Sequence, residues 1–370
     1  MNSIYIHVPF CKSRCIYCDF YSTTLGQESM TLYVQALKHE LTLRRKFIKD
    51  SRVHTIYIGG GTPSLLPTDL MQELFATIGE DFSIDGDAEV TIEANPDDVT
   101  EEWLKGLEGT PLNRISMGAQ TFDDELLRFL KRRHNAQQIT EAVKTCKEAG
   151  IKNISLDLIY GIPGQSMSDW QRDVEQALKL DITHLSAYSL SYEEGTRINE
   201  MLRSRLVKET DEELSRQMYD YLMCATNEAG FLHYEISNFA LPSFLSRHNS
   251  SYWEGTPYLG LGAGAHSYDG LRTRRANLPD IKAYITAKGD VPHETETLSD
   301  ESLYNEFIMT RLRTSHGIPL EELSEVDSDY CLASAEKHLK HNLMRLKNNH
   351  LCLTKKGIFT SNDIISDLMK

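Results

Sequence analysis

Short apolar runs alternate with longer amphipathic stretches along the first half of the chain. Thr31–Ile48 and Ser166–Leu180 predict helices, because apolar residues recur there at helical spacing, and Thr210 to Glu213 predicts a capping box that opens another. This alternation is typical of a parallel sheet, since parallel strands are joined by crossover helices. The pattern predicts six strands: Ser3–Val8, Thr55–Ile58, Glu89–Ala94, Arg114–Gly118, Ile154–Ile159 and His184–Ser189. Six such units indicate an α/β fold, a partial (β/α)6 TIM-like barrel with functional groups at the carboxyl ends of its strands.

A different pattern follows residue 298. Ser299–Leu312 and Ala333–Leu346 predict helices, and the apolar runs Leu351–Leu353 and Ile358–Phe359 flank a Thr-Lys-Lys-Gly turn. A helix followed by a small hairpin resembles a winged-helix module of the α+β type. Such modules often bind DNA, but acidic and basic residues are about balanced here, so a docking or lid role is favoured over nucleic-acid binding.

Composition narrows the class of protein. With 370 residues, of which 40% are hydrophobic and 25% charged, the chain is long enough for one large domain and a small one. A net charge of −15 argues against non-specific binding of nucleic acid. The first ten residues lack the cationic lead and the apolar stretch of a signal peptide, and no later run is long enough for a membrane span. We therefore expect a cytoplasmic protein.

Three cysteines lie close together near the N-terminus, namely Cys11, Cys15 and Cys18. A tetrahedral zinc site needs four ligands, and no fourth Cys or His follows at the usual distance. The spacing therefore predicts a [4Fe–4S] cluster that is held at three irons, with the fourth iron open to another ligand. The alternative is a set of buried thiols that act as small hydrophobic side chains. We expect that role for Cys146, and no function for the isolated cysteines Cys224, Cys331 and Cys352.

Glycines and polar residues follow the predicted strands. Gly59, Gly60 and Gly61 remove every Cβ from one turn, which would let the backbone approach a ligand, although a tight turn explains them about equally well. Glu93, Gln120, Arg132 and Asp157 lie at or just past strand ends, where they suit the amino, carboxylate and hydroxyl groups of a ligand. Gly260–Gly264 lacks the context of a dinucleotide site and predicts a close-packed turn.

Six segments together resemble a known family. Cys11, Cys15 and Cys18, with Tyr17 before the last cysteine, match the signature of the radical S-adenosylmethionine (SAM) superfamily. Within it the chain resembles the oxygen-independent coproporphyrinogen III oxidase-like family. The resemblance rests on YIHVPFCKSRCIYCDF, IGGGTPSLL, IEANPDD, RISMGAQTF, LDLIYGIPGQ and RHNSSYW. It implies a radical SAM core over residues 1–230, a connecting segment over 231–298 and the family's C-terminal module over 299–370.

The resemblance also implies roles for individual residues. The three clustered cysteines would ligate the [4Fe–4S] cluster, and Tyr5 and Tyr17 would line the SAM pocket. The residues that would contact SAM itself are Gly60, Gly61, Thr62, Glu93, Gln120, Arg132 and Asp157.

Two subgroups of this family differ at positions that the chain reveals. Oxidases carry an N-terminal extension and a further Cys two residues after the third cluster ligand, whereas this chain starts its first strand at Ser3 and has Phe20 at that position. Conversely, the segment from His248 to Trp253 matches the H-N-x-x-Y-W motif that is associated with heme binding in the heme-chaperone subgroup. We expect His248 to be an axial ligand of heme iron, with Tyr252 and Trp253 packing beside it. Two interpretations stay open for Arg272, Arg274 and Arg275. Either they pair with the propionates of heme, or they belong to a solvated basic loop.

Two functions remain open from the sequence. The first is a heme chaperone that binds heme, a [4Fe–4S] cluster and SAM and passes heme to acceptor proteins. The alternative is an oxygen-independent coproporphyrinogen III oxidase, in which a radical derived from SAM would start decarboxylation. No catalytic residue is assigned, and the sequence leaves open a homodimer and association with a membrane through an acceptor.

Overall fold

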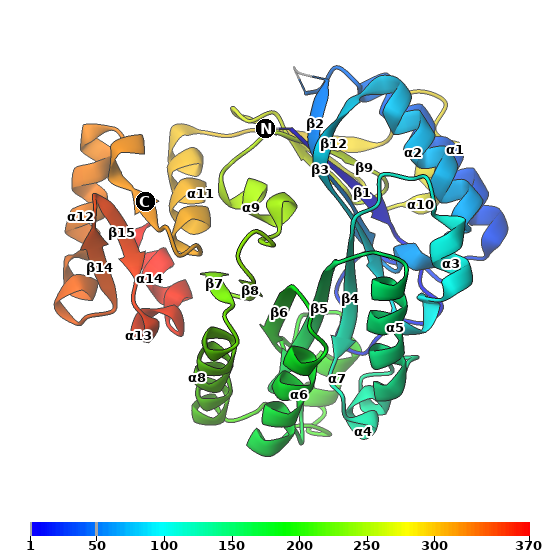
Figure 1. Cartoon of the computed structure of the whole chain (residues 1–370). Helices are drawn as coiled ribbons and strands as arrows, with labels where there is room; N and C mark the ends of the chain where they lie inside the picture. Colours follow the sequence, from blue (N-terminus) through cyan, green and yellow to red (C-terminus); the bar gives the residue numbers. More distant parts are fainter. Residues whose placement is uncertain (1, 49–50) are drawn as a thin grey trace.

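The computed structural model describes residues 2–48 and 51–370 (Figure 1). Six parallel strands run in sequence order from β1 to β6, which confirms the α/β fold class. The first and last have the predicted bounds, and the four between them are longer than predicted. The strands are β1 (Ser3–Val8), β2 (Arg52–Gly60), β3 (Ser83–Ala94), β4 (Arg114–Gln120), β5 (Asn153–Tyr160) and β6 (His184–Ser189).

Strands from the connecting segment extend this sheet at both edges. In the described part of the chain the order is β12-β11-β10-β9-β1-β2-β3-β4-β5-β6-β8-β7. Strand β9 pairs with β1 in parallel, and β8 pairs with β6 antiparallel. The added strands are β7 (Leu232–Glu235), β8 (Asn238–Ala240), β9 (Tyr258–Leu261), β10 (His266–Tyr268), β11 (Thr273–Asn277) and β12 (His293–Thr297).

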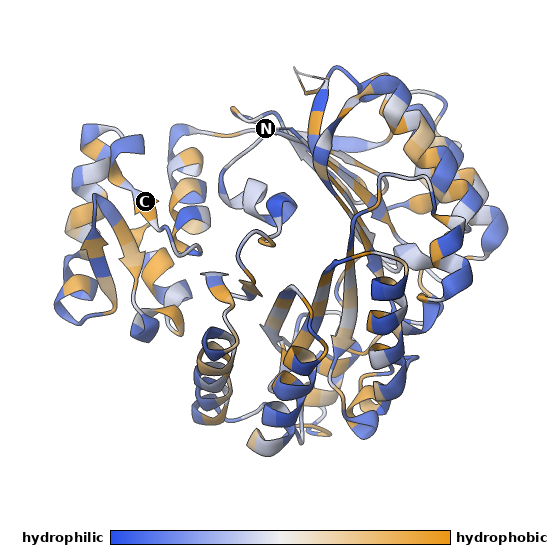
Figure 2. Ribbon diagram, in the orientation of Figure 1, coloured by the Kyte–Doolittle hydropathy of each residue, from blue (hydrophilic) through white to orange (hydrophobic). Residues whose placement is uncertain are grey.

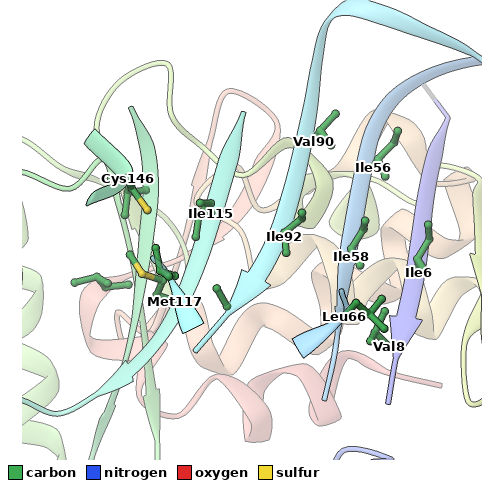
Figure 3. Packing of buried hydrophobic residues seen from close by; sticks show 14 of the residues in the cluster. Ile6, Val8, Ile56, Ile58, Leu66, Val90, Ile92, Ile115, Met117 and Cys146 are labelled. Atoms are coloured by element: carbon green, nitrogen blue, oxygen red, sulfur yellow. The ribbon is translucent and has the colours of Figure 1, made fainter. Parts of the chain in front are cut away.

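Helices cover the outer face of the curved sheet, as Figure 1 shows for α1 to α6. Apolar residues at alternate strand positions point towards these helices, among them Ile6, Ile58, Ile92 and Met117 (Figure 3). Apolar and hydrophilic residues alternate along the helices (Figure 2), as expected for elements with one buried face. The helices are α1 (Gln27–Arg44), α2 (Thr68–Asp81), α3 (Glu101–Gly106), α4 (Asp124–Phe129), α5 (Ala136–Glu148), α6 (Met167–Lys179), α7 (Arg197–Arg203), α8 (Glu212–Glu228) and α10 (Ile281–Thr286).

Two helix starts differ from the sequence prediction. Helix α1 begins and ends four residues earlier than expected, and Ile48 packs into the core from beyond its end. Helix α8 is capped by Asp211, whose carboxylate accepts hydrogen bonds from the backbone of Glu213 and Leu214. The predicted capping box is therefore wrong by one residue, because Thr210 donates its hydroxyl hydrogen bond to the carbonyl of Gly161. Short 3₁₀ turns occur at Pro63–Leu65, Pro96–Asp98 and Leu320–Glu322.

The C-terminal module has its own apolar core around Ile308, Leu312 and Leu351. Helix α11 is confirmed, with Ser299 as its N-cap. The second predicted helix and the predicted hairpin are both misplaced along the chain, because α12 starts earlier and Met344 already belongs to a strand. The elements are α11 (Asp300–Leu312), β13 (Ile318–Pro319), α12 (Glu325–Lys340), β14 (Met344–Lys347), β15 (His350–Leu353), α13 (Lys355–Ile358) and α14 (Ser361–Leu368).

One short helix, α9 (Arg247–Trp253), lies on the inner side of the curved sheet (Figure 1). Its backbone N–H groups at Arg247 and His248 donate to the carboxylate of Glu89, at 3.0 and 2.9 Å, which fixes the start of the helix against β3. The aromatic motif is therefore part of a helix. None of the helices in residues 2–48 and 51–370 combines the length and apolar composition needed to cross a bilayer.

Candidate functional site

The inner face of the sheet carries a cavity of about 420 Å³. Its lining residues on β4 and β5 alternate with the core residues that point outwards, so one face of each strand packs the helices and the other faces the cavity. The cavity is lined by all three clustered cysteines and by eight of the nine residues expected at SAM. These eight are Tyr17, Gly60, Gly61, Thr62, Glu93, Gln120, Arg132 and Asp157.

Tyr5 is the ninth residue, and it does not line this cavity. Its hydroxyl lies 3.0 Å from Nδ1 of His7, and its ring stacks on Tyr57 with the ring centroids 6.2 Å apart. Tyr57 in turn donates a hydrogen bond of 2.7 Å to Glu93. Tyr5 therefore supports the cavity wall through Tyr57.

The loop after β1 holds the cysteines at one end of the cavity. Its base is closed by two backbone hydrogen bonds: the N–H of Cys11 donates to the carbonyl oxygen of Thr23 at 2.8 Å, and the N–H of Thr23 donates to the carbonyl oxygen of Pro9 at 2.6 Å. The sulfur of Cys11 accepts a hydrogen bond from the hydroxyl of Thr62 at 3.5 Å, and the sulfur of Cys15 accepts one from Arg132 at 3.4 Å. Unlike Cys146, all three cysteines are partly exposed.

The chemistry of these donors fits an iron–sulfur cluster. Burial raises the pKa of Cys18 to about 11, so the free chain holds a thiol there and a bound metal would displace its proton. Within the described ranges no three His, Cys, Asp or Glu side chains are placed to hold a single metal ion. The cysteines of a [4Fe–4S] cluster do not have to converge on one metal ion, because each thiolate binds a different iron.

The glycine turn after β2 lies directly against the cysteine loop. A Cβ on Gly61 would lie 2.8 Å from the carbonyl oxygen of Phe10 and 3.0 Å from the sulfur of Cys11. Gly60 has a φ of +116°, and a Cβ there would lie 2.6 Å from the ring of His7. Both positions therefore require glycine, which lets the end of β2 and the cluster loop meet.

Two carboxyl groups face the middle of the cavity. Burial raises the pKa of Glu93 to about 7, although hydrogen bonds from Tyr57 and from the backbone N–H of Gly60 act to lower it. Burial likewise raises the pKa of Asp157 to about 6, although a hydrogen bond from Ser186 acts to lower it. A cationic ligand would favour the ionised form of both groups, so this part of the cavity suits an ammonium or sulfonium group.

Arg132 reaches the cavity from a different place than the sequence suggested. It follows helix α4 and does not end a strand, so that expectation is wrong, but its guanidinium bonds the carbonyl oxygen of Gly118 at 2.6 Å and also the side chain of Asn95. Its Nε is buried and has no hydrogen-bond partner within the described residues. Gln120, at the end of β4, has a φ of +68°, a strained conformation of the kind that clusters at functional sites.

The residues expected at heme lie behind the cavity wall. His248 is buried, with Nδ1 2.8 Å from the hydroxyl of Thr55 and Nε2 3.0 Å from the hydroxyl of Tyr252. Burial lowers the pKa of His248 to about 3, so its imidazole is neutral. The neighbouring Asn249 lines the cavity. The indole N–H of Trp253 is buried without a partner in the part of the chain that the structure describes.

The three arginines at and just before β11 already have carboxylate partners. Arg272 pairs with Asp300, Arg274 with Glu306 at 2.6 Å, and Arg275 with Asp290 at 2.6 Å. Arg274 and Arg275 belong to the paired strand β11, whereas Arg272 precedes that strand and is exposed. A heme propionate would have to compete with these carboxylates.

Sequence reasoning missed several polar residues of the cavity wall. Arg114 and Ser116 point into the cavity from β4, Ser186 and Tyr188 from β6, and Asn249 from α9. The signal was the alternation in RISMGAQ, where small and polar residues occupy every second position of an otherwise apolar strand.

Comparison with known proteins agrees with this architecture. Residues 5–177 match the radical SAM superfamily and residues 298–360 match the HemN C-terminal domain. The solved coproporphyrinogen III oxidase (HemN) from Escherichia coli superposes with a TM-score of 0.85 at 22% identity, covering 100% of this chain and 90% of that one. This likeness shows the fold.

Closer relatives are curated proteins named heme chaperone HemW. The protein from Lactococcus lactis is 38% identical over 87% of this chain and 84% of its own length. The protein from Bacillus subtilis is 34% identical over 98% of both chains, and that from Escherichia coli is 34% identical over 86% of this chain and 84% of its own. Radical SAM proteins use SAM and a [4Fe–4S] cluster, and the cavity brings the expected residues for both together. The chain belongs to the HemW family of the radical SAM superfamily.

Proposed function

We propose that this protein is a heme chaperone that binds heme together with a [4Fe–4S] cluster and SAM and passes the heme to acceptor proteins in the cytoplasm. The observation that carries the proposal is the similarity to proteins named heme chaperone HemW over nearly the whole chain, together with Phe20 at the position where the oxidase pattern has Cys. Free cysteines throughout the described chain are consistent with a reducing compartment.

The cavity provides the contacts that SAM needs. Cys11, Cys15 and Cys18 would hold the cluster, which when bound supplies an electron and an open iron for the amino and carboxylate groups of SAM. Glu93 and Asp157 would face the positively charged part of the ligand, because a cation beside them favours their ionised forms over the neutral forms that burial favours. The glycine turn brings backbone groups close to the ligand.

Helix α9 is the proposed heme contact. The imidazole of His248 is neutral, as an axial ligand must be, and heme iron would replace the hydroxyl of Tyr252 at Nε2. Thr55 would keep its contact with Nδ1 and so hold the ring orientation, which is the usual task of a partner at the second nitrogen. Tyr252 and the partnerless indole N–H of Trp253 would then be free to contact the macrocycle or its substituents.

One experiment separates the chaperone from the oxidase. Protein reconstituted anaerobically with iron and sulfide is mixed with SAM, a reductant and either heme or coproporphyrinogen III. We expect stable heme uptake, seen as a Soret band that moves to an added apo-acceptor, and no protoporphyrinogen. A Cys15→Ser variant is the matched control without a cluster. Multiple turnovers of coproporphyrinogen III, with no heme uptake, would overturn the proposal.

A further inference from the structure

Strand β4 sends a ladder of four residues into the cavity. Arg114, Ser116, Gly118 and Gln120 line it, whereas Ile115, Met117 and Ala119 between them are buried in the core. At about 3.3 Å per residue, the step from Gln120 back to Arg114 covers roughly 20 Å. The cluster end is fixed at Gly118, because Arg132 joins its carbonyl oxygen to the sulfur of Cys15. Arg114 therefore lies at the opposite, inner end of the cavity.

The charge of Arg114 has no partner at this end. The side chain is 1% exposed, its Nε has no hydrogen-bond partner, and no ion pair or side-chain hydrogen bond involves its guanidinium among residues 2–48 and 51–370. Arg44 shows what the fold normally does with a buried arginine. It bonds Glu40, the carbonyl oxygen of Gly260 and the hydroxyl of Ser267, each at 2.8 Å.

The groups around Arg114 do not neutralise it. The imidazoles of His184 and His248 feel its charge and are neutral, because burial lowers the pKa of both. The carboxyl groups of Glu93 and Asp157 also feel it, yet neither lies within ion-pair distance, and both face the part of the cavity expected to hold SAM. A buried, unpaired charge lowers the stability of a fold, so a protein retains one where a ligand of opposite charge binds to it.

We propose that Arg114 anchors an anionic subsite at the inner end of the cavity, which binds a carboxylate group of a ligand held beneath the SAM site. A guanidinium forms two parallel hydrogen bonds with a carboxylate, which gives orientation as well as affinity. Asn249 lines the same cavity from α9 and adds a neutral polar group next to His248. The identification of this carboxylate as a propionate of heme rests on the proposed function.

The test uses metal-free protoporphyrin IX and its dimethyl ester as probes, added to the full-length, cluster-reconstituted protein with SAM. We expect the free acid to bind about tenfold more tightly than the ester, the effect of one charge-assisted hydrogen-bonded pair. Arg114→Gln removes this preference by weakening only the acid. Arg114→Lys restores part of it, since an ammonium keeps the charge but not the fork. Arg216→Gln, which removes an exposed cation paired with Glu213 on helix α8, is the matched control and leaves the preference intact.

Each outcome decides the proposal. Equal affinities of acid and ester in the unaltered protein overturn it, and this comparison stands even where both Arg114 variants fail to fold, as judged by circular dichroism and cluster absorbance. Unchanged acid affinity in a folded Arg114→Gln variant also overturns it. If that variant loses its SAM response as well, the carboxylate of SAM and not that of a second ligand lies at Arg114. The probes lack iron, so this test does not depend on heme transfer. If the protein prefers the acid but fails to transfer heme, only the proposed chaperone function is overturned.

Discussion

Glu93→Gln tests the electrostatics of the SAM pocket in the ligand-free protein. The pKa of Glu93 is raised from 4.5 to about 7, chiefly by burial. At about 1.4 kcal/mol per pKa unit, this shift corresponds to at most about 3 kcal/mol, and partial exposure to the cavity lowers the figure. The unfolded chain ionises first, so the free energy of unfolding falls as the pH rises from about 4.5 to about 7.

Glutamine carries no charge to bury, so the variant should escape this loss. We expect the free energy of unfolding of Glu93→Gln, relative to that of the unaltered protein, to rise by about 2 kcal/mol between pH 5 and pH 8. A lost hydrogen bond from Tyr57 or Gly60 subtracts about 1 kcal/mol at both pH values and cancels in this comparison. Asp157, which also titrates near pH 6, is present in both proteins.

Stability is measured by urea unfolding of anaerobic, ligand-free protein at the two pH values, followed by circular dichroism. Function is measured separately, as the change that added SAM causes in the EPR signal of the reduced cluster. The variant should gain stability at pH 8 and lose the change that SAM causes in the EPR signal of the reduced cluster. The same stability difference between the two proteins at pH 5 and pH 8 would refute the reasoning, because the carboxyl group would then titrate normally.

Three further predictions follow from the site and the module. Replacing Cys15 by Ser should abolish the roughly four irons and four sulfides of the reconstituted protein, whereas Cys146→Ser should keep them; cluster loss in the second variant would contradict the ligand assignment. His248→Ala should weaken heme binding or shift the Soret band and spare cluster absorbance, and an unchanged heme spectrum would exclude it as axial ligand. Asn349→Val should destabilise the C-terminal module by about 1–2 kcal/mol, because Asn349 has a φ of +63°; thermal unfolding that equals the parent's would count against this.

The strands were predictable because they repeat one physical pattern. Residues such as Ile56 and Ile58 must pack under helices, and the sequence shows them at every second position. The cluster cysteines follow β1, and most residues of the SAM pocket lie in the last residues of a strand or just after it, so sequence motifs identify them. The sequence did not identify Arg114 as a cavity residue, because Arg114 is the first residue of its strand and only the fold places that end of β4 inside the cavity.

The C-terminal hairpin was misplaced because helical spacing continues past the end of α12. Asn342 ends that helix with a φ of +56°, which is a common conformation just beyond a helix. Asn348 and Asn349 both have positive φ and form the two-residue turn between β14 and β15. Thr354 then caps α13, so Ile358 ends a helix and belongs to no strand. Paired asparagines are a hairpin signal that apolar periodicity alone does not contain.

The pairing of β1 with β9 has a consequence for synthesis on the ribosome. β1, which leads into the cysteine loop, pairs on one edge with β2 and on the other with Tyr258–Leu261. The buried Glu40 of α1 likewise accepts hydrogen bonds from Gly262, Asn277 and Tyr284. At about 5–20 residues per second, these partners emerge on the order of tens of seconds after β1. Until then the nascent chain presents an open strand edge next to the cysteine loop, and β1 gains its second neighbouring strand only when the last third of the chain arrives.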